Sequence, residues 1–121
     1  MIAHVRAYSP STKLLLLTPP PIHGPTRAAL MAPAPLDRAQ GTTKAYAKAV
    51  LEVGQTEGVA VLDVFGAVEC ALEGDLEQAA GLFRDGLHLN RKGYQVRPRV
   101  CRFNRPLPTL TPPKFASTDS L

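Results

Sequence analysis

The sequence predicts an α/β fold in which a parallel sheet lies between layers of helices. Two continuous apolar runs, residues 13–18 and 59–64, are typical of strands covered on both faces, where alternation of apolar and polar residues disappears. A helical pattern lies between the two runs, and further helical and loop segments follow, which is the element order of three-layer α/β/α folds. Because two strands alone make a poor sheet, we expect the chain to be part of such a domain.

The first third of the chain is expected to hold a short helix, a strand and a long loop. Residues 1–8 are typical of the last turns of a helix, which stops where Ser9 precedes a proline. The strand over residues 13–18 ends at three consecutive prolines, which cannot donate the hydrogen bonds of a sheet. These prolines predict a rigid turn; alternatively, they form one wall of a substrate pocket. From residue 22 to 35, the mixture of Pro, Gly and Ala predicts a loop.

The helix between the two strands is predicted from its cap, its apolar face and its end. Asp37 is expected to cap it, with Gln40 three residues further on as in a capping box. Its apolar face follows the i, i+4, i+7 spacing through Tyr46, Val50 and Val53. Gly58 is well placed to end the helix in a left-handed turn.

The second strand leads into shorter elements. Asp63 ends this strand, and we expect its carboxylate to cap a neighbouring helix or to bond loop amides. Residues 69–82 predict a short helical stretch broken by two glycines. Residues 85–88 follow as a loop, and Asn90 is expected to cap a final helix that runs into Tyr94.

Composition changes abruptly near Val96. Residues 1–96 hold equal numbers of basic and acidic residues, so the whole net charge of +4 belongs to residues 97–121. This basic segment is also rich in proline, and it is predicted to be a disordered tail that is not native to the folded domain of residues 1–96. Nucleic-acid binding is not expected, because the tail has few aromatic residues between its arginines.

The sequence predicts a cytoplasmic protein without a membrane segment. Cys70 and Cys101 do not form a disulfide framework, and neither has a histidine or cysteine at metal-ligand spacing. The amino terminus lacks the apolar core of a signal peptide. The apolar run at residues 14–17 is far shorter than the roughly 20 residues that span a bilayer.

The candidate catalytic residues are Asp85 and His88, three positions apart in the loop after the second strand. A carboxylate at this spacing is able to orient the ring through Nδ1 and leave Nε2 free as a general base. Spacing alone leaves a structural alternative open, in which Asp85 caps a turn and His88 packs beneath the last helix. No serine in a nucleophile turn accompanies the pair.

Four segments, in one order along the chain, carry a family resemblance: residues 14–21, Tyr46-Ala47, residues 61–64 and residues 82–90. Together they resemble the carboxy-terminal half of the SGNH (GDSL-type) hydrolases, in particular the isoamyl acetate-hydrolysing esterases. The resemblance covers residues 1–96. It implies a partial three-layer α/β/α, flavodoxin-like fold with a parallel sheet, whose amino-terminal strands are missing from this sequence.

The resemblance also implies a chemistry. His88 matches the catalytic base of the family and Asp85 the acid of its triad. The family's Gly-Asp-Ser and Gly-x-Asn-Asp blocks, which supply the nucleophile and oxyanion donors, are absent; Gly74-Asp75, for example, is followed by Leu76. The implied activity is hydrolysis of small acyl esters such as acetates by a lipase-like serine esterase, with no cofactor and with little activity expected from this chain.

A non-enzymatic alternative is a truncated product or partner-binding fragment. Its exposed sheet edges would favour self-association, because an unpaired strand edge offers free backbone groups to another chain.

Overall fold

A computed structural model describes residues 1–101 and contains three short strands among five helices of α or 3₁₀ type and one further 3₁₀ turn. The elements in chain order are α1 (Ile2–Tyr8), β1 (Leu15–Leu17), α2 (Gly24–Met31), α3 (Gln40–Glu57), β2 (Ala60–Asp63), α4 (Val64–Ala71), the 3₁₀ helices η1 (Leu76–Leu82) and η2 (Gly93–Gln95), and β3 (Arg99–Cys101). The α/β class predicted from the sequence is confirmed.

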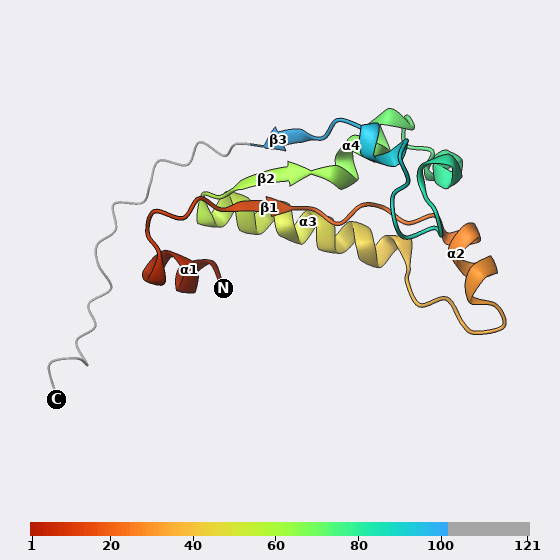
Figure 1. Ribbon diagram of the computed structural model, residues 1–121, viewed down its shortest axis with the longest axis horizontal. Helices are drawn as coiled ribbons and strands as arrows, with labels where there is room; N and C mark the ends of the chain where they lie inside the picture. The colour runs from red at the N-terminus through yellow and green to blue at the C-terminus, as the bar shows by residue number, and fades with distance from the viewer. Residues whose placement is uncertain (102–121) are drawn as a thin grey trace, which may run out of the picture.

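The strands form one sheet in the order β1-β2-β3 (Figure 1). β1 and β2 are parallel, with Leu16 opposite Val61, as expected for two strands joined through a helix. β3 runs antiparallel to β2, with Val100 opposite Leu62. β2 is therefore the central strand, and β1 has a neighbour on one side only among the described residues.

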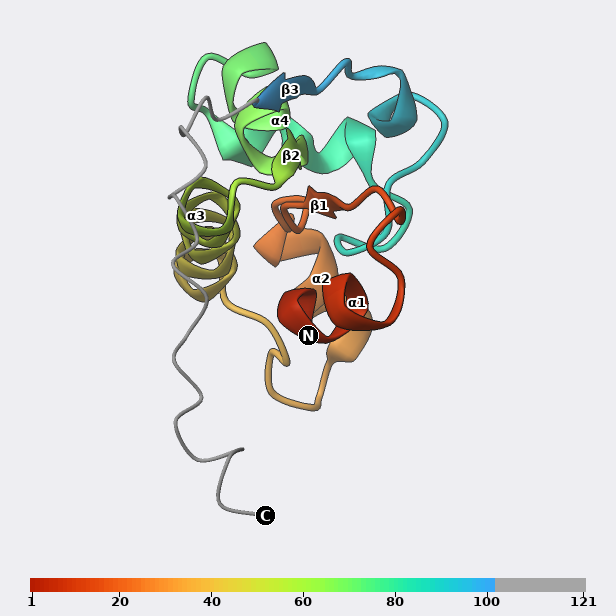
Figure 2. The same cartoon turned by 90° about the vertical axis from the view of Figure 1, so that its left-hand side faces the viewer.

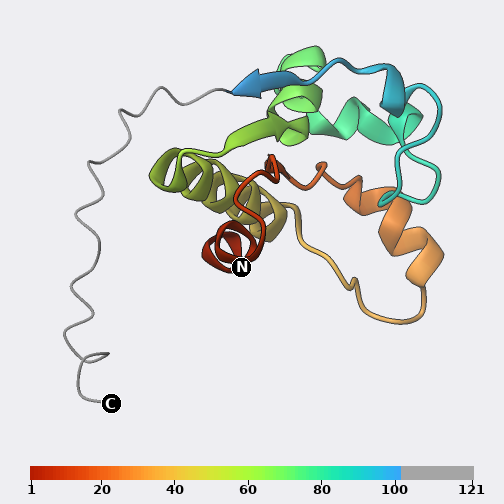
Figure 3. The ribbon, with the colours of Figure 1, turned by 60° about the vertical axis from the view of Figure 1, so that its left-hand side comes forward.

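The helices surround this small sheet unevenly. α3 packs against β2 and β1, and the end-on view of Figure 2 shows it on one side of the stacked strands. α1 is tied to the end of α3, where Arg6 Nη2 donates to the Glu57 carbonyl over 2.8 Å. Figure 3 shows α2 at the opposite end of the molecule, beside the loop that precedes η2.

The buried core is centred on β2 and α4. Val61 and Val68 have no exposed surface, and Phe65 is 3% exposed. β1 differs, because Leu15 and Leu17 are about half exposed. The expectation that both apolar runs are covered on both faces is therefore wrong for β1, because Leu15 and Leu17 share one face of the strand and that face is only partly covered by the described residues.

Thr18 and Asp63 join the carboxyl ends of β1 and β2. The Thr18 hydroxyl donates to Asp63 Oδ1 over 3.0 Å and accepts from the Phe65 backbone N–H over 2.9 Å. Asp63 Oδ1 also accepts from the Gly66 N–H at the start of α4. The predicted capping role of Asp63 is confirmed, and α4 begins directly after it, earlier than the helical stretch expected over residues 69–82.

Helix α2 lies inside the segment predicted to be a loop, so that prediction is wrong for residues 24–31. His23 caps the helix through its ring, which accepts from the Thr26 N–H. Pro25 occupies the first turn, where its missing N–H costs nothing, and Ala, Leu and Met residues follow. A proline ahead of a run of good helix formers was the signal for this helix.

Helix α3 begins at Gln40 without a side-chain cap, so the expected capping by Asp37 is wrong. Gln40 instead accepts from the Ile22 N–H through Oε1. The predicted apolar face is largely uncovered, with Tyr46 67% exposed, while Ala47 on a neighbouring face is buried. Gly58 ends the helix in a left-handed conformation at φ 65°, as predicted.

The last described segment contains a short 3₁₀ turn and a strand. Asn90 Oδ1 accepts from the backbone N–H groups of Lys92 and Gly93, so its capping role is confirmed, although η2 is only three residues long. β3 occupies residues 99–101 of the segment predicted to be a disordered tail. Residues 102–121 lie outside the described residues, and that prediction stays a prediction for them.

Candidate active site

The two candidate catalytic residues lie in a narrow loop beyond the carboxyl end of β1. An antiparallel bridge between Phe83 and Leu89 closes the loop. Across it, the Arg84 N–H donates to the His88 carbonyl over 2.9 Å. The chain is thereby held in a tight turn that brings Asp85 and His88 together.

The Asp85 carboxylate uses both oxygens within this turn. Oδ1 accepts from the backbone N–H groups of Leu87 and His88, at 3.0 and 2.7 Å. Oδ2 lies 2.7 Å from His88 Nδ1. Asp85 therefore caps the turn and also orients the ring, so the two roles that the sequence left open occur together. His88 does not pack beneath the last helix, because its side chain is 69% exposed.

Three hydrogen bonds hold the pKa of Asp85 well below its usual range: those from the His88 backbone, from the His88 ring and from the Leu87 backbone. Because the carboxylate stays ionised, His88 Nδ1–H donates to it, which leaves Nε2 as the acceptor nitrogen of the neutral ring. No described residue forms a hydrogen bond with Nε2. The arrangement provides a base that is oriented on one side and open on the other.

Gly86 lets this loop lie against the first turn of α2. Its φ is +78°, and a Cβ added there would lie 2.6 Å from both the Arg27 backbone nitrogen and the His23 carbonyl oxygen. The His23 N–H also donates to the Gly86 carbonyl over 2.9 Å. No side chain fits at this position, so the glycine of the Asp-Gly-Leu-His run is required by close packing.

Arg27 lies beside the pair and was missed by the sequence analysis. Its guanidinium contacts Asp37 through two hydrogen bonds, of 3.0 and 2.9 Å. Its Nη1 lies 3.7 Å from Asp85 Oδ2. Asp37, expected to cap a helix, is instead the bidentate partner of Arg27, and this pairing lowers the pKa of Asp37.

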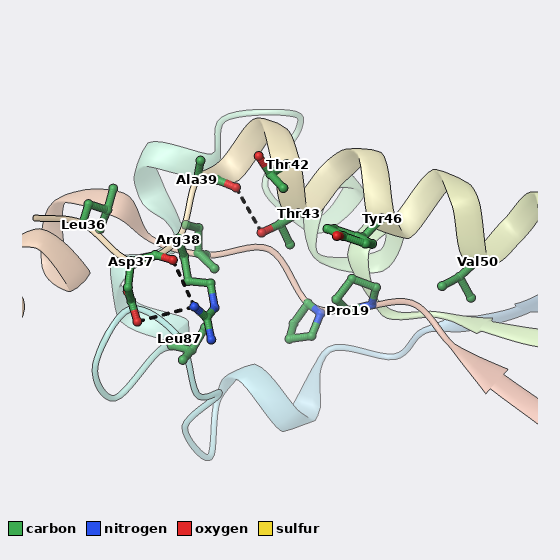
Figure 4. Close-up of a pocket in the computed structure, with 12 residues that line it drawn as sticks. Pro19, Leu36, Asp37, Arg38, Ala39, Thr42, Thr43, Tyr46, Val50 and Leu87 are labelled. Atoms are coloured by element: carbon green, nitrogen blue, oxygen red, sulfur yellow. Dashed lines mark hydrogen bonds and ion pairs between the residues drawn. The ribbon is translucent and has the colours of Figure 1, made fainter.

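A largely apolar cavity of about 820 Å³ borders the loop (Figure 4). One wall comes from α3, one from the segment after β1, and Leu87 projects into it from the loop. Pro19 and Pro20 line it, so the proline run does form a wall as well as a turn. The other lining residues are Ile22, Leu36, Asp37, Arg38, Ala39, Thr42, Thr43, Tyr46 and Val50.

No cluster of three or more His, Cys, Asp or Glu side chains among residues 1–101 is arranged to hold a metal ion. None of the helices in this part of the chain combines the length and the apolar character needed to cross a membrane. Cys70 is exposed and carries a free thiol.

The model of the GDSL-like lipase/acylhydrolase family matches residues 1–96. This range includes Asp85, His88 and every residue that lines the cavity beside them. No curated protein matches the chain, and no solved structure matches it.

Proposed function

We propose, starting from the fact that the chain belongs to the GDSL-like lipase/acylhydrolase family, that it carries the acid–base half of a serine ester hydrolase site. Asp85 and His88 are the residues we assign to this half. The observation that carries the assignment is the 2.7 Å contact between Asp85 Oδ2 and His88 Nδ1, with Nε2 left open. An imidazole held in this way is the arrangement that a hydroxyl nucleophile needs.

In the proposed reaction His88 first accepts a proton from the serine and then donates it to the alcohol leaving group. A serine Oγ forms a bond to the ester carbonyl carbon while its proton passes to His88 Nε2. The imidazolium, stabilised by the Asp85 carboxylate, then returns the proton to the alcohol oxygen as the ester C–O bond breaks. Water repeats the two steps on the acyl-serine and releases the acid. The sequence holds no Gly-Asp-Ser block, so we assign the serine of this reaction to no residue of this sequence.

The substrate class we propose is small acyl esters such as acetates, as in the isoamyl acetate-hydrolysing esterases that the sequence resembles. The cavity that Leu87 of the loop lines supports this class. Most of its lining residues are apolar or aromatic, the others being Asp37, Arg38, Thr42 and Thr43, and its volume of about 820 Å³ accommodates a small apolar ester.

Hydrolysis of p-nitrophenyl acetate tests whether the chain contains a nucleophile and oxyanion donors in addition to the acid–base pair. Without a nucleophile or oxyanion donors, we expect no saturable turnover by the pure chain. His4→Ala is the matched control for His88→Ala, because His4 is also exposed and its ring packs against Tyr8, away from the loop. Saturable turnover lost in His88→Ala and kept in His4→Ala would show that the chain supplies its own nucleophile.

The full transcript across both ends of this reading frame tests the proposed hydrolase itself. An in-frame segment with Gly-Asp-Ser and Gly-x-Asn-Asp blocks would supply the missing groups. We expect a protein expressed from such a frame to hydrolyse the ester, and we expect His88→Ala to abolish this activity. An active longer protein that is indifferent to both His88→Ala and Asp85→Asn would refute the assignment.

A partner-binding role is the second candidate, and the exposed edge of β1 favours it. Leu15 and Leu17 are 51% and 56% exposed, and β1 has no neighbour on its outer side among the described residues. We propose that a second copy of the chain pairs with this edge, because an unpaired apolar strand is a ready template for another strand.

A further inference from the structure

Arg27 is positioned between two carboxylates that belong to different parts of the chain. Nε and Nη2 donate to the two oxygens of Asp37, which precedes α3, and Nη1 faces Asp85 in the loop. The Arg27 side chain is only 17% exposed, and Asp37 and Asp85 are each less than a third exposed. The three groups therefore form a partly buried bridge rather than a solvated surface pair.

The oxygen of Asp85 that faces Arg27 is the same one that binds the His88 ring. Oδ2 lies 3.7 Å from Arg27 Nη1 and 2.7 Å from His88 Nδ1. The two backbones are also in close contact, because a Cβ added at Gly86 would lie 2.6 Å from the Arg27 backbone nitrogen. The arginine side chain thus starts from a segment that packs directly against the loop that carries the base.

We propose that Arg27 is a positioning residue for the Asp85–His88 pair. The inference rests on the proposed function, since it concerns the same site. Asp37 anchors the guanidinium with two hydrogen bonds, which gives Nη1 a fixed place beside Asp85 Oδ2. That place favours the carboxylate rotamer in which Oδ2 faces His88 Nδ1. Asp37 also lines the cavity (Figure 4). Through Arg27 and Asp85, the bridge therefore connects the cavity wall to the base.

The charged groups around the bridge are few within the described part of the chain. Asp85 has Arg27 and His88 within ion-pair distance. Asp37 has Arg27 and also Arg38, whose Nη1 lies 3.6 Å from Asp37 Oδ2. His23, the other titratable group on this side of the loop, points to Thr26 and to the Glu77 carbonyl. Arg38 is thus a natural control, because it contacts Asp37 but not Asp85.

Ring nitrogen NMR of the full chain without substrate tests the proposal. The measured quantity is the fraction of neutral His88 that carries its proton on Nδ1, at a pH where the ring is uncharged. His88→Ala identifies the His88 signals among the three histidines. Asp85→Asn gives the baseline in which the orienting carboxylate is lost. We expect Arg27→Gln to lower the fraction toward this baseline and Arg38→Gln to leave it at the value of the unmutated chain.

The outcomes separate the inference from the proposed function. If Asp85→Asn lowers the fraction but a folded Arg27→Gln does not, the inference on Arg27 is wrong and the pair stands. If Asp85→Asn has no effect, the assigned pair itself fails. Should circular dichroism show that Arg27→Gln is unfolded, Arg27→Lys decides instead. The lysine keeps the charge but loses the fork, so an intermediate fraction supports the proposal and an unchanged one overturns it.

Discussion

The Asp85–Asn90 loop and strand β1 differ in how far their side chains interact with the rest of the chain. In the loop, Asp85 binds two backbone N–H groups and the His88 ring, and Asn90 binds the Gly81 carbonyl and two further N–H groups. In β1, by contrast, Leu15 and Leu17 remain about half exposed. The Asp85 and Asn90 side chains find hydrogen-bond partners within the loop and its flanks, whereas the leucine side chains of the strand are only partly buried.

The difference shows how far each kind of interaction reaches along the chain. The hydrogen bonds of the Asp85 and Asn90 side chains join residues no more than nine positions apart. The start of α2 adds three long-range contacts: the hydrogen bond from the His23 N–H to the Gly86 carbonyl, the close packing at Gly86 and the ion pair of Arg27 with Asp85. Burial of β1 needs a neighbour from elsewhere. A shallow cavity of about 520 Å³ between α1, β1 and α3, lined by Ile2, Leu16 and Val53 among others, continues this apolar surface. The geometry of the Asp85–His88 pair therefore depends mainly on residues close in the sequence, whereas burial of β1 depends on residues far from it.

Gly86→Ala should give the largest effect, because it disrupts the close packing of the loop against the start of α2. A left-handed φ costs an alanine about 1–2 kcal/mol, and the close contacts with α2 add to this, for a total of about 2–4 kcal/mol. Urea unfolding followed by circular dichroism measures the loss. Gly81→Ala is the control, because a Cβ there meets nothing within 4 Å. Equal effects of the two substitutions would show that the loop does not rest on α2.

Asn90→Ala should have the next largest effect, since it tests closure of the loop from within. The substitution removes the acceptor for the Lys92 and Gly93 N–H groups and the donor to the Gly81 carbonyl. We expect a loss of about 1–2 kcal/mol in the free energy of unfolding, typical of a lost cap. Gln78→Ala, which removes one exposed side-chain bond to Asp75, should cost less. If Asn90→Ala costs no more than Gln78→Ala, the cap contributes nothing measurable.

What the sequence predicts correctly follows the same division. The Asp85–His88 spacing, the Gly58 turn and the capping roles of Asp63 and Asn90 are all local patterns, and the structure has each of them. Strands β1 and β2 are also predicted correctly, because a run of apolar residues is visible without knowing its neighbours, whereas β3 lies in the segment predicted to be disordered. The catalytic role of the pair remains a proposal.

The errors arise where distant residues compete for one side chain. Asp37 has the spacing of a helix cap, but Arg27, ten positions earlier, takes its carboxylate in two hydrogen bonds. Arg27 is not part of a recognisable motif, and its helix was not predicted because the segment is rich in Pro, Gly and Ala. The apolar pattern of β1 predicts a strand that is buried on both faces. It does not indicate which segment of the protein buries it.

The pH dependence of stability gives a smaller effect and probes the charge of the loop. Folding lowers the pKa of Asp85, so its contribution is present above the unfolded value of about 3.9 and is lost as pH falls through the folded value. The difference in unfolding free energy between the unmutated chain and Asp85→Asn should shrink as pH falls below about 4. Asp37 titrates with the same sign but is present in both proteins, so it cancels. A difference that does not change with pH would mean that the carboxylate is not held ionised by the turn.

Leu17→Lys should have the smallest effect on stability and the clearest effect on association. The side chain is already 56% exposed, so we expect the free energy of unfolding to change by no more than about 0.5 kcal/mol. A charge on an edge strand opposes pairing with another edge, so self-association seen by sedimentation velocity at rising protein concentration should decrease. Leu30→Lys is the matched control, because Leu30 on α2 is 61% exposed and lies away from the sheet edge.

If both variants reduce association equally, general hydrophobicity and not the β1 edge drives the association. If the unmutated chain is a monomer at all concentrations, the edge does not pair with a second copy. Loss of association in Leu17→Lys alone would show that β1, unlike the loop, obtains from a second copy the contacts that its own chain does not supply.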